Sequence, residues 1–574
     1  MMSSPDGRTY RIAVGLSALL AVLLCCLSSC TPPETGFAQV RSQSQRRSGY
    51  GPSWTRGIAE DELVNRMVAE LLSDELTLDK AVQIALVNNR RLQATFEELG
   101  VRRGALIQAG LPENPVFSGD WRFFSKGVAF EGVLTQNVIS IITIPMRREL
   151  EGNRFEASKL NAIEQTIHLV ADIKRAFFRY QASKQMVEML QHVVQATKGS
   201  YMLMERLREA GNTRQLDVFR ERALYEEAKV ALNHAVATVA ANREQLNSLM
   251  GLWGPQTQWE TPTRLPEPPG HLGLRPHEDS QGVAAIDLGQ FPPKGKMTTT
   301  APTATATGQV QTLAQRLAGP PTYKQIAGAR AGILGPGEVK QEDVPVEQLW
   351  RVTGPSSERF IQVERRAMEE SLNLAIAWRL VQAQSGRLKL DTTLAIFPFL
   401  DAGGTAERNP EGKWGAGPAV SSPIPLFDCG QGQVTQESSR LRQRVEQYAA
   451  LATEIRAIAR SAEAGFQASR SRVLYVRDVI MPLHAALVAE SQLQYNAMQI
   501  TPFQLLSAKV QQIQAGQQYV LALAEYWLAR TDLEQVLDGS LPPGVSSHLM
   551  AMPAAGMLPD APGPGVGRQE SRNP

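Results

Sequence analysis

The sequence predicts a mainly α-helical protein with a small β part, in which the order helix, strand, strand, long helix, return helix occurs twice. Three observations predict this class. The segment 153–210 contains no proline and has apolar residues at helical spacing, which favours one very long helix. Short segments in both halves instead alternate with the period of a strand. The chain of 574 residues, 43% of them hydrophobic, is also too long for one ordinary domain.

The N-terminus has the pattern of an exported protein. Arg8 and Arg11 precede an apolar run, 12–27, that is too short for a confident membrane span. The run ends in Leu27-Ser28-Ser29-Cys30, which resembles the lipobox of bacterial lipoproteins. We therefore expect residues 1–29 to be a lipoprotein signal peptide, Cys30 to be acylated, and residues 30–74 to be a lipidated tether. A chance cysteine at the end of a signal peptide or short anchor is the alternative.

The first repeat is expected at residues 75–262. Thr77 can cap a helix that runs to about Gln108 and ends before Gly110-Leu111-Pro112. Two alternating segments then predict strands, and after them two antiparallel helices form a coiled-coil-like hairpin; their expected ranges are 116–123, 128–138, 153–210 and 214–249. Strands of about ten residues can cross a bilayer when tilted, although an ordinary soluble hairpin has the same pattern.

The second repeat is expected at residues 365–540. Before it, residues 263–364 form a Pro-, Gly- and Thr-rich insert that we expect to be partly disordered, and residues 541–574 form a disordered tail. The expected elements of this repeat are a helix at 365–384, strands at 392–400 and 414–422, a long helix at 433–497 and a return helix at 502–537. Pro482 should kink the long helix of this repeat.

Composition and motifs argue against several functional classes. Lys plus Arg number 59 and Asp plus Glu 57, so no strong field recruits nucleic acid. The seven His are scattered, and neither a metal-binding HExxH nor a nucleotide-binding GxxxxGK[ST] motif occurs. Cys429 has no His nearby in sequence that would indicate a base, so we assign it no chemistry. We expect no enzymatic activity, catalytic residue, metal or cofactor.

Three motifs, taken with the double plan, resemble the TolC-type outer membrane efflux proteins, particularly the lipoprotein branch that serves tripartite efflux systems. They are Leu76-Thr77-Leu78-Asp79-Lys80-Ala81 leading to Ala85-Leu86-Val87-Asn88-Asn89-Arg90, the segment 207–218 between the first two hairpin helices, and Pro425-Leu426-Phe427-Asp428-Cys429-Gly430. The resemblance implies a homotrimer whose helices close a trimeric α-barrel joined to a transmembrane β-barrel. Physical reasoning agrees on one point, because four strands per chain are too few to close a barrel alone.

The resemblance also implies a function. The protein would be a passive outer-membrane channel of a tripartite efflux or type I secretion system, anchored to outer-membrane lipid through Cys30 and extending into the periplasm. A periplasmic adaptor and an inner-membrane pump would deliver the solute, because the chain has no nucleotide-binding motif. Metal, drug and protein export all use this plan. The alternative is a lipid-anchored periplasmic coiled-coil scaffold or an adaptor lipoprotein, neither of which explains paired strands in both halves.

The family resemblance assigns adaptor docking or gating to the two hairpin tips. The second tip departs from the family pattern, with Met498 where glycine is usual and Gln504 where the first tip has Asp217. A carboxylate near a constriction would tune cation preference, and Asp217 is the candidate. The alternative for these residues is a solvated polar turn. The candidate tip residues are Arg208, Gly211, Asn212, Thr213, Asp217, Tyr495, Met498 and Gln504.

Overall fold

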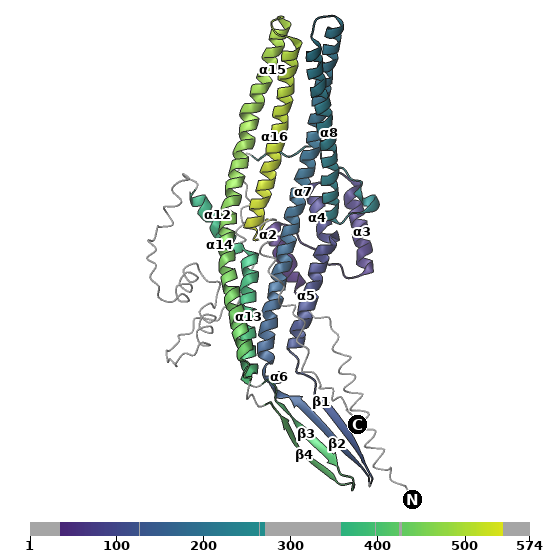
Figure 1. Ribbon diagram of the computed structural model, residues 1–574, viewed down its shortest axis with the longest axis vertical. Coiled ribbons are helices and arrows are strands. Elements are labelled where there is room, and N and C mark those ends of the chain that lie inside the picture. Colours follow the sequence, from purple (N-terminus) through teal and green to yellow (C-terminus); the bar gives the residue numbers. More distant parts are fainter. Residues whose placement is uncertain are drawn as a thin grey trace, which may run out of the picture.

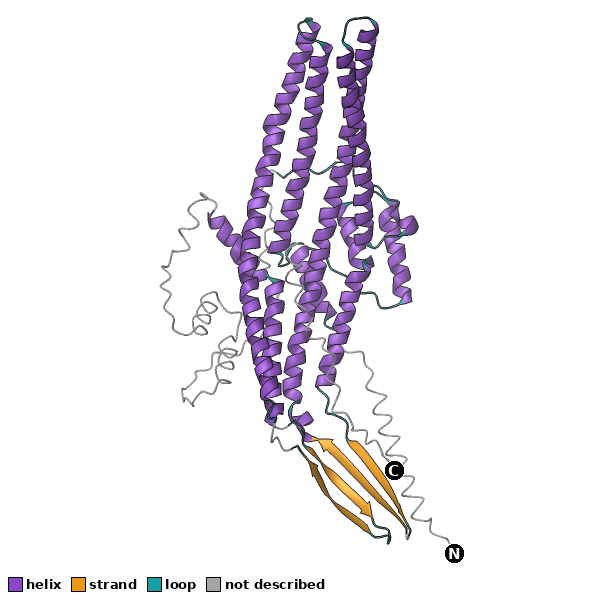
Figure 2. Ribbon diagram, viewed as in Figure 1, coloured by secondary structure: helices purple, strands orange, loops and turns teal. Residues whose placement is uncertain are grey.

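The computed structural model describes residues 35–125, 127–262, 264–269, 357–396, 398–423 and 428–542. Cys30, the expected signal peptide, most of the insert 263–364 and nearly all of the tail lie outside these residues. The described part is elongated. Long helices form one end and a small sheet forms the other, as Figure 1 shows along the chain and Figure 2 by type of element.

The first repeat has the predicted order of elements. The helix expected at 77–108 is two helices, because the Asn89 side chain accepts hydrogen bonds from the backbone N–H groups of Arg91 and Leu92 and so starts a new helix. Thr77 caps the first of them as predicted. The elements are α4 (Leu78–Asn88), α5 (Arg90–Ala109), β1 (Val116–Phe124), β2 (Gly127–Asn137), α6 (Val138–Ile142), α7 (Ile144–Glu209), α8 (Gln215–Met250) and η1 (Gly254–Thr257).

The second repeat copies the hairpin of the first with the same lengths. Its elements are α12 (Ser357–Glu370), α13 (Leu372–Ile396), β3 (Asp401–Arg408), β4 (Trp414–Ser421), α14 (Gln431–Tyr475), η3 (Val476–Ile480), α15 (Met481–Asn496) and α16 (Pro502–Leu537). In the second repeat, the long helix and the return helix begin and end one constant interval after their counterparts in the first repeat. The long helices begin at residues 144 and 431, and the return helices end at residues 250 and 537. The predicted internal duplication is therefore confirmed.

One predicted strand is wrong. Residues 392–396 continue helix α13, where the hydroxyl groups of Thr392 and Thr393 donate to carbonyls one turn earlier. The strand is instead β3, which the sequence hides because Asp and two glycines are poor strand formers. The glycine at 403 is required by the close approach of β2, since a Cβ there would lie 1.8 Å from the carbonyl oxygen of Leu134.

The N-terminal segment is more structured than the expected tether 30–74. It contains α2 (Phe37–Ser48) and α3 (Ile58–Ser73), and Val40 and Val68 are fully buried. The low apolar content of α2 hid this helix, which is held partly by Arg47 bonding backbone carbonyls of the second repeat. Residues 357–364, expected in the insert, form the first half of α12.

The predicted effect of Pro482 is confirmed as an interruption of the second long helix. The α-helical hydrogen bonding of α14 stops at Tyr475, a five-residue π-helix follows, and α15 begins at Met481 with the proline in its first turn. Proline cannot donate a backbone hydrogen bond, and a π-turn is one way of accommodating the missing donor. The corresponding residues of α7 are uninterrupted.

The core surrounds the middle of α7, whose buried face packs against α2, α4, α5, α8, α13 and α16. Elements from both repeats therefore share one core. In the part of the chain that the structure describes, no helix is both long enough and apolar enough to pass through a membrane.

Candidate functional site

The four strands form one antiparallel sheet in the order β1-β2-β3-β4, so β2 and β3 join the two repeats. The strands have 9, 11, 8 and 8 residues, close to the length that spans a bilayer when tilted. Among the described residues, β1 and β4 each pair with one strand only and leave their outer edges open. Exposed edges of this kind are normally covered or paired in a stable protein.

The register separates the sheet into an apolar face and a polar face. Trp121 opposes Phe130, and Phe130 also contacts Trp414 with ring centroids 6.4 Å apart. These aromatic rings gather on the apolar face toward the β-turn end of the sheet. The apolar face carries Phe117, Trp121, Phe123, Val128, Phe130, Leu134, Ala402, Ala406, Trp414, Ala416 and Val420.

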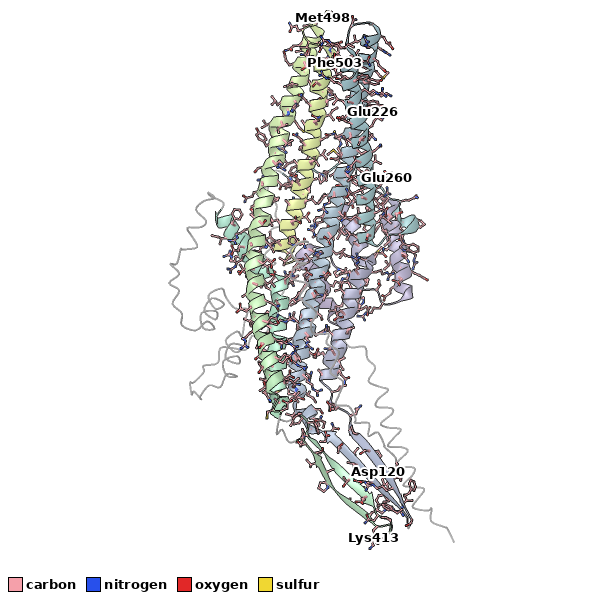
Figure 3. All side chains as sticks on the ribbon, viewed as in Figure 1. Asp120, Glu226, Glu260, Lys413, Met498 and Phe503 are labelled. Carbon is pink, nitrogen blue, oxygen red and sulfur yellow. The ribbon has the colours of Figure 1, made fainter. Side chains whose placement is uncertain are left out.

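A row of three carboxylates crosses the polar face. Asp120 opposes Glu131, and Glu131 opposes Glu407, so the three lie side by side on β1, β2 and β3. Arg122 bonds Asp120 and Glu131, each at 2.9 Å. Every charged residue of the strands lies on this face except Arg408, which is at the end of β3. Figure 3 places Asp120 in the sheet, far from the hairpin tips.

At the first hairpin tip, α7 ends in a Schellman turn. The backbone N–H of Asn212 donates to the carbonyl of Leu207, and that of Gly211 donates to Arg208. Gly211 has φ 76°, the left-handed conformation that this turn requires. The predicted tip residues Arg208, Gly211 and Asn212 therefore build or flank one turn.

The second tip has the same turn with a different residue at its centre. The N–H of Gln499 donates to the carbonyl of Gln494, and that of Met498 donates to Tyr495. Met498 has φ 56° and is the one non-glycine residue with a positive φ in the described part of the chain. Its side chain is 93% exposed. Figure 3 shows Met498 at the far end of the helices, with Phe503 just below it.

The remaining predicted tip residues make local contacts. Gln504 closes a capping box with Thr501 at the start of α16, accepting a hydrogen bond from the Thr501 backbone N–H at 2.9 Å. Asp217 lies at the corresponding position in the first turn of α8, and its carboxylate is 3.5 Å from the Arg220 guanidinium. Thr213 is half-buried in the loop before α8. Cys30 lies outside the described residues.

Large apolar side chains are exposed along the distal helices. Helix α15 has no buried residue, although its sequence contains leucines at helical spacing. Their helical spacing identifies an apolar face, but it does not show what covers that face. The exposed residues include Leu216, Phe219, Leu224, Val230, Val236, Leu483, Leu487 and Leu493.

A buried polar network joins the repeats below the tips. Arg175 on α7 bonds Asp172, Asp532 and Gln535, each at 2.7 Å, and Asp172 also contacts His168 at 3.1 Å. The hydrogen bond to Asp172 raises the pKa of His168. Burial raises the pKa of Glu164, which accepts a hydrogen bond from Ser540. Sequence analysis missed this network because its members are far apart along the chain.

These features define a class. A pair of long helical hairpins above a four-stranded antiparallel sheet with open edges is the fold of the TolC-type outer-membrane channels. Residues 147–252, which cover most of α7 and all of α8, match the family model described as outer membrane efflux protein. The predicted resemblance to the outer membrane efflux proteins is confirmed. No curated protein sequence matches the chain.

Solved structures of outer-membrane proteins share this fold. The chain is 14% identical to the outer-membrane channel OprN, with a TM-score of 0.55 and coverage of 82% of this chain and 92% of that one. For the open state of the MtrE channel of Neisseria gonorrhoeae the identity is 15% and the TM-score 0.53, with coverage of 81% of this chain and 89% of that one. For the outer membrane protein VceC of Vibrio cholerae the identity is 12% and the TM-score 0.51, with coverage of 83% of this chain and 97% of that one. At these identities the likeness establishes the fold.

Proposed function

We propose that the chain is a passive outer-membrane efflux channel that works as a homotrimer. The observation that carries the proposal is the sheet, which has an apolar face, a polar face and two open edges. Three copies would supply twelve strands, with the apolar face toward lipid, the carboxylate row toward the lumen, and each β1 edge paired with a neighbour's β4. A lipid-anchored scaffold or adaptor would leave the apolar sheet face without a function.

The distal helices support the same assembly. Leu224, Val230 and Val236 on α8 are at least half exposed in the single chain, as is Leu483 on α15. Side-by-side copies would bring α8 of one chain against α15 of the next and cover both sets of residues. Burial of this apolar surface is favourable at about 25 cal/mol per Å². The helices of three copies would then enclose a tube through the periplasm.

Two partner proteins are part of the proposal. The position of the tips supports an adaptor, and the absence of a nucleotide-binding motif from the sequence supports a separate pump. We assign docking of a periplasmic adaptor to both tips, with Arg208, Gly211, Asn212, Thr213 and Asp217 on the first. Tyr495, Met498 and Gln504 are their counterparts on the second tip. An inner-membrane pump would supply the energy. Acylation of Cys30 would anchor each chain in the outer membrane, and loss of palmitate labelling in a Cys30→Ser variant tests this anchor.

The channel proposal is tested by recording ion currents through detergent-extracted protein in planar lipid bilayers. The wild-type protein is expected to conduct with a preference for cations, because the carboxylate row outnumbers Arg122. The double variant Glu131→Gln/Glu407→Gln should shift the reversal potential toward that of an unselective pore. Glu411→Gln, in the β3–β4 turn, is the matched control and should leave it unchanged. Protein that never conducts would refute the proposal.

A further inference from the structure

The second tip places an apolar side chain in a strained backbone position. A left-handed conformation brings Cβ too close to the following carbonyl oxygen, so residues other than Gly, Asn and Asp rarely adopt it. Met498 adopts it and is also the most exposed of the large hydrophobic residues in the described ranges, at 93%. Neither feature contributes to folding. Backbone strain of this kind is typically retained at functional sites.

The first tip shows that the turn itself does not need methionine. Gly211 occupies the corresponding position, with the same pair of backbone hydrogen bonds and a similar φ. No atom lies within 4 Å of a Cβ placed on Gly211, so the turn leaves open space for a side chain pointing outward. The turn therefore positions Met498 to project from the helix end, where glycine would offer no contact surface.

Charge also distinguishes the two tips. The eighteen residues 491–508 around Met498 contain no Asp, Glu, Lys or Arg. The corresponding residues 204–221 of the first tip contain Glu205, Arg206, Arg208, Glu209, Arg214, Asp217, Arg220 and Glu221. An uncharged tip next to a highly charged one indicates two surfaces with different binding chemistry.

We propose that Met498 inserts into an uncharged apolar pocket of the adaptor that seats end-on on the second tip, whereas the first tip binds the same adaptor through charges. The inference rests on the adaptor docking of the proposed function and specifies its chemistry. The occupant is a separate protein because Figure 3 places Met498 at the extreme end of the helices, whereas neighbouring copies would contact their sides. A flexible, polarizable methionine suits an apolar pocket that is not shaped in advance.

The test is binding of each purified periplasmic adaptor of the host, one at a time, to the detergent-solubilised full chain immobilised on a sensor surface. For the adaptor that binds the wild-type protein, Met498→Gly should raise Kd by about tenfold or more, the loss expected for a buried Met side chain. Met498→Leu should stay within about threefold, because volume-conserving apolar changes are tolerated. Met202→Ala, at an exposed methionine on α7, is the control and should bind like the wild-type protein.

The salt dependence of adaptor binding distinguishes the apolar second tip from the charged first tip. The ratio of Met498→Gly to wild-type Kd should stay constant as salt rises, whereas the corresponding ratio for Arg208→Ala should shrink, because salt screens exposed charges. Met498→Gly should also unfold at a higher temperature than the wild-type protein, since it removes the strain, so weaker binding cannot be ascribed to misfolding.

Three results would overturn the proposal. Wild-type affinity in Met498→Gly would show that the exposed methionine contacts nothing. Dissociation of the Met498→Gly oligomer in size-exclusion chromatography would show that the side chain faces a second copy of this chain. Binding of no adaptor to the wild-type protein, with channel conductance intact, would refute adaptor docking itself and the inference with it.

Discussion

The two hairpins have identical lengths and different surroundings. Helix α7 is continuous over 66 residues and buries much of its middle against other elements. Its counterpart is interrupted by the π-helix η3, and the part beyond the interruption, α15, packs on α16 but has no fully buried residue. The two hairpins share their length and turn geometry, as the proposed tube would require, whereas their packing differs. The first hairpin packs against elements of both repeats, whereas the distal part of the second hairpin remains accessible for contacts with other molecules.

The contacts at the C-terminal ends of the return helices α8 and α16, here called the joints, differ in the same way between the repeats. In the first repeat, Gly251 packs on the end of α4, and the Asn88 side-chain amide donates to the carbonyls of Met250 and Gly251. In the second repeat, Gly539 packs on the carbonyl of Glu370, and the donor is Arg47 from α2. The N-terminal helix therefore supplies in the second joint what an asparagine supplies in the first.

The largest expected effect is at the tighter joint. A Cβ at Gly539 would lie 2.1 Å from the carbonyl oxygen of Glu370, and φ there is 94°. Gly539→Ala should destabilise the chain by more than about 4 kcal/mol, because both the clash and the backbone conformation oppose a side chain. Thermal unfolding of the purified protein measures this. Gly251→Ala, where the closest atom is 2.8 Å away, should cost less, and the opposite order would contradict the account.

The next prediction compares Arg47 with Asn88, the hydrogen-bond donors at the two joints. Arg47→Ala leaves the carbonyls of Glu370 and Asp538 without this partner and should cost about 3 kcal/mol, in the range for hydrogen bonds from charged groups. Asn88→Ala removes neutral hydrogen bonds and should cost about 2 kcal/mol. Denaturant unfolding of both variants tests the order. An unaffected Arg47→Ala protein would restore the interpretation of residues 30–74 as a tether.

The polar network around Arg175, which includes His168 and Asp172 on α7, predicts a pH dependence. His168 has a raised pKa, so the stabilisation from its protonated form is complete below its ordinary value near 6.5 and is lost as pH rises through the raised value. Asp172, whose pKa is lowered by His168 and Arg175 despite burial, stays ionised throughout this range. His168→Gln should remove about 1.5 kcal/mol at pH 6 and little at pH 9. Melting curves of both proteins at the two pH values check this, and equal losses would refute it.

The smallest effect concerns the turns themselves. Gly211→Met would give the first tip the strained residue of the second and should cost about 1 kcal/mol. Thermal unfolding, with Gly211→Asn as the tolerated control, measures the strain at a position where the side chain has no assigned partner. A cost of zero would mean that Met498 is not strained either.

Sequence predicted the elements whose signal is local. Periodicity and helix-breaking residues predicted the hairpin helices, and Pro482 predicted a disturbance of the second long helix, which is the π-helix Val476–Ile480 just before the proline. Strand β3 was missed because its glycines serve a close approach to β2, and α2 because Arg47 holds it through carbonyls from the far end of the chain. At the site, the tip turns followed from sequence, but the carboxylate row required the register of three strands from both repeats.

The central claim is that one chain forms an open third of a closed tube. Electron microscopy of the full chain, extracted from outer membranes in detergent and imaged in negative stain, tests it most directly. The account predicts elongated particles with threefold symmetry, in which the open edges of β1 and β4 are joined between copies. Monomers, or compact particles released without detergent, would contradict it.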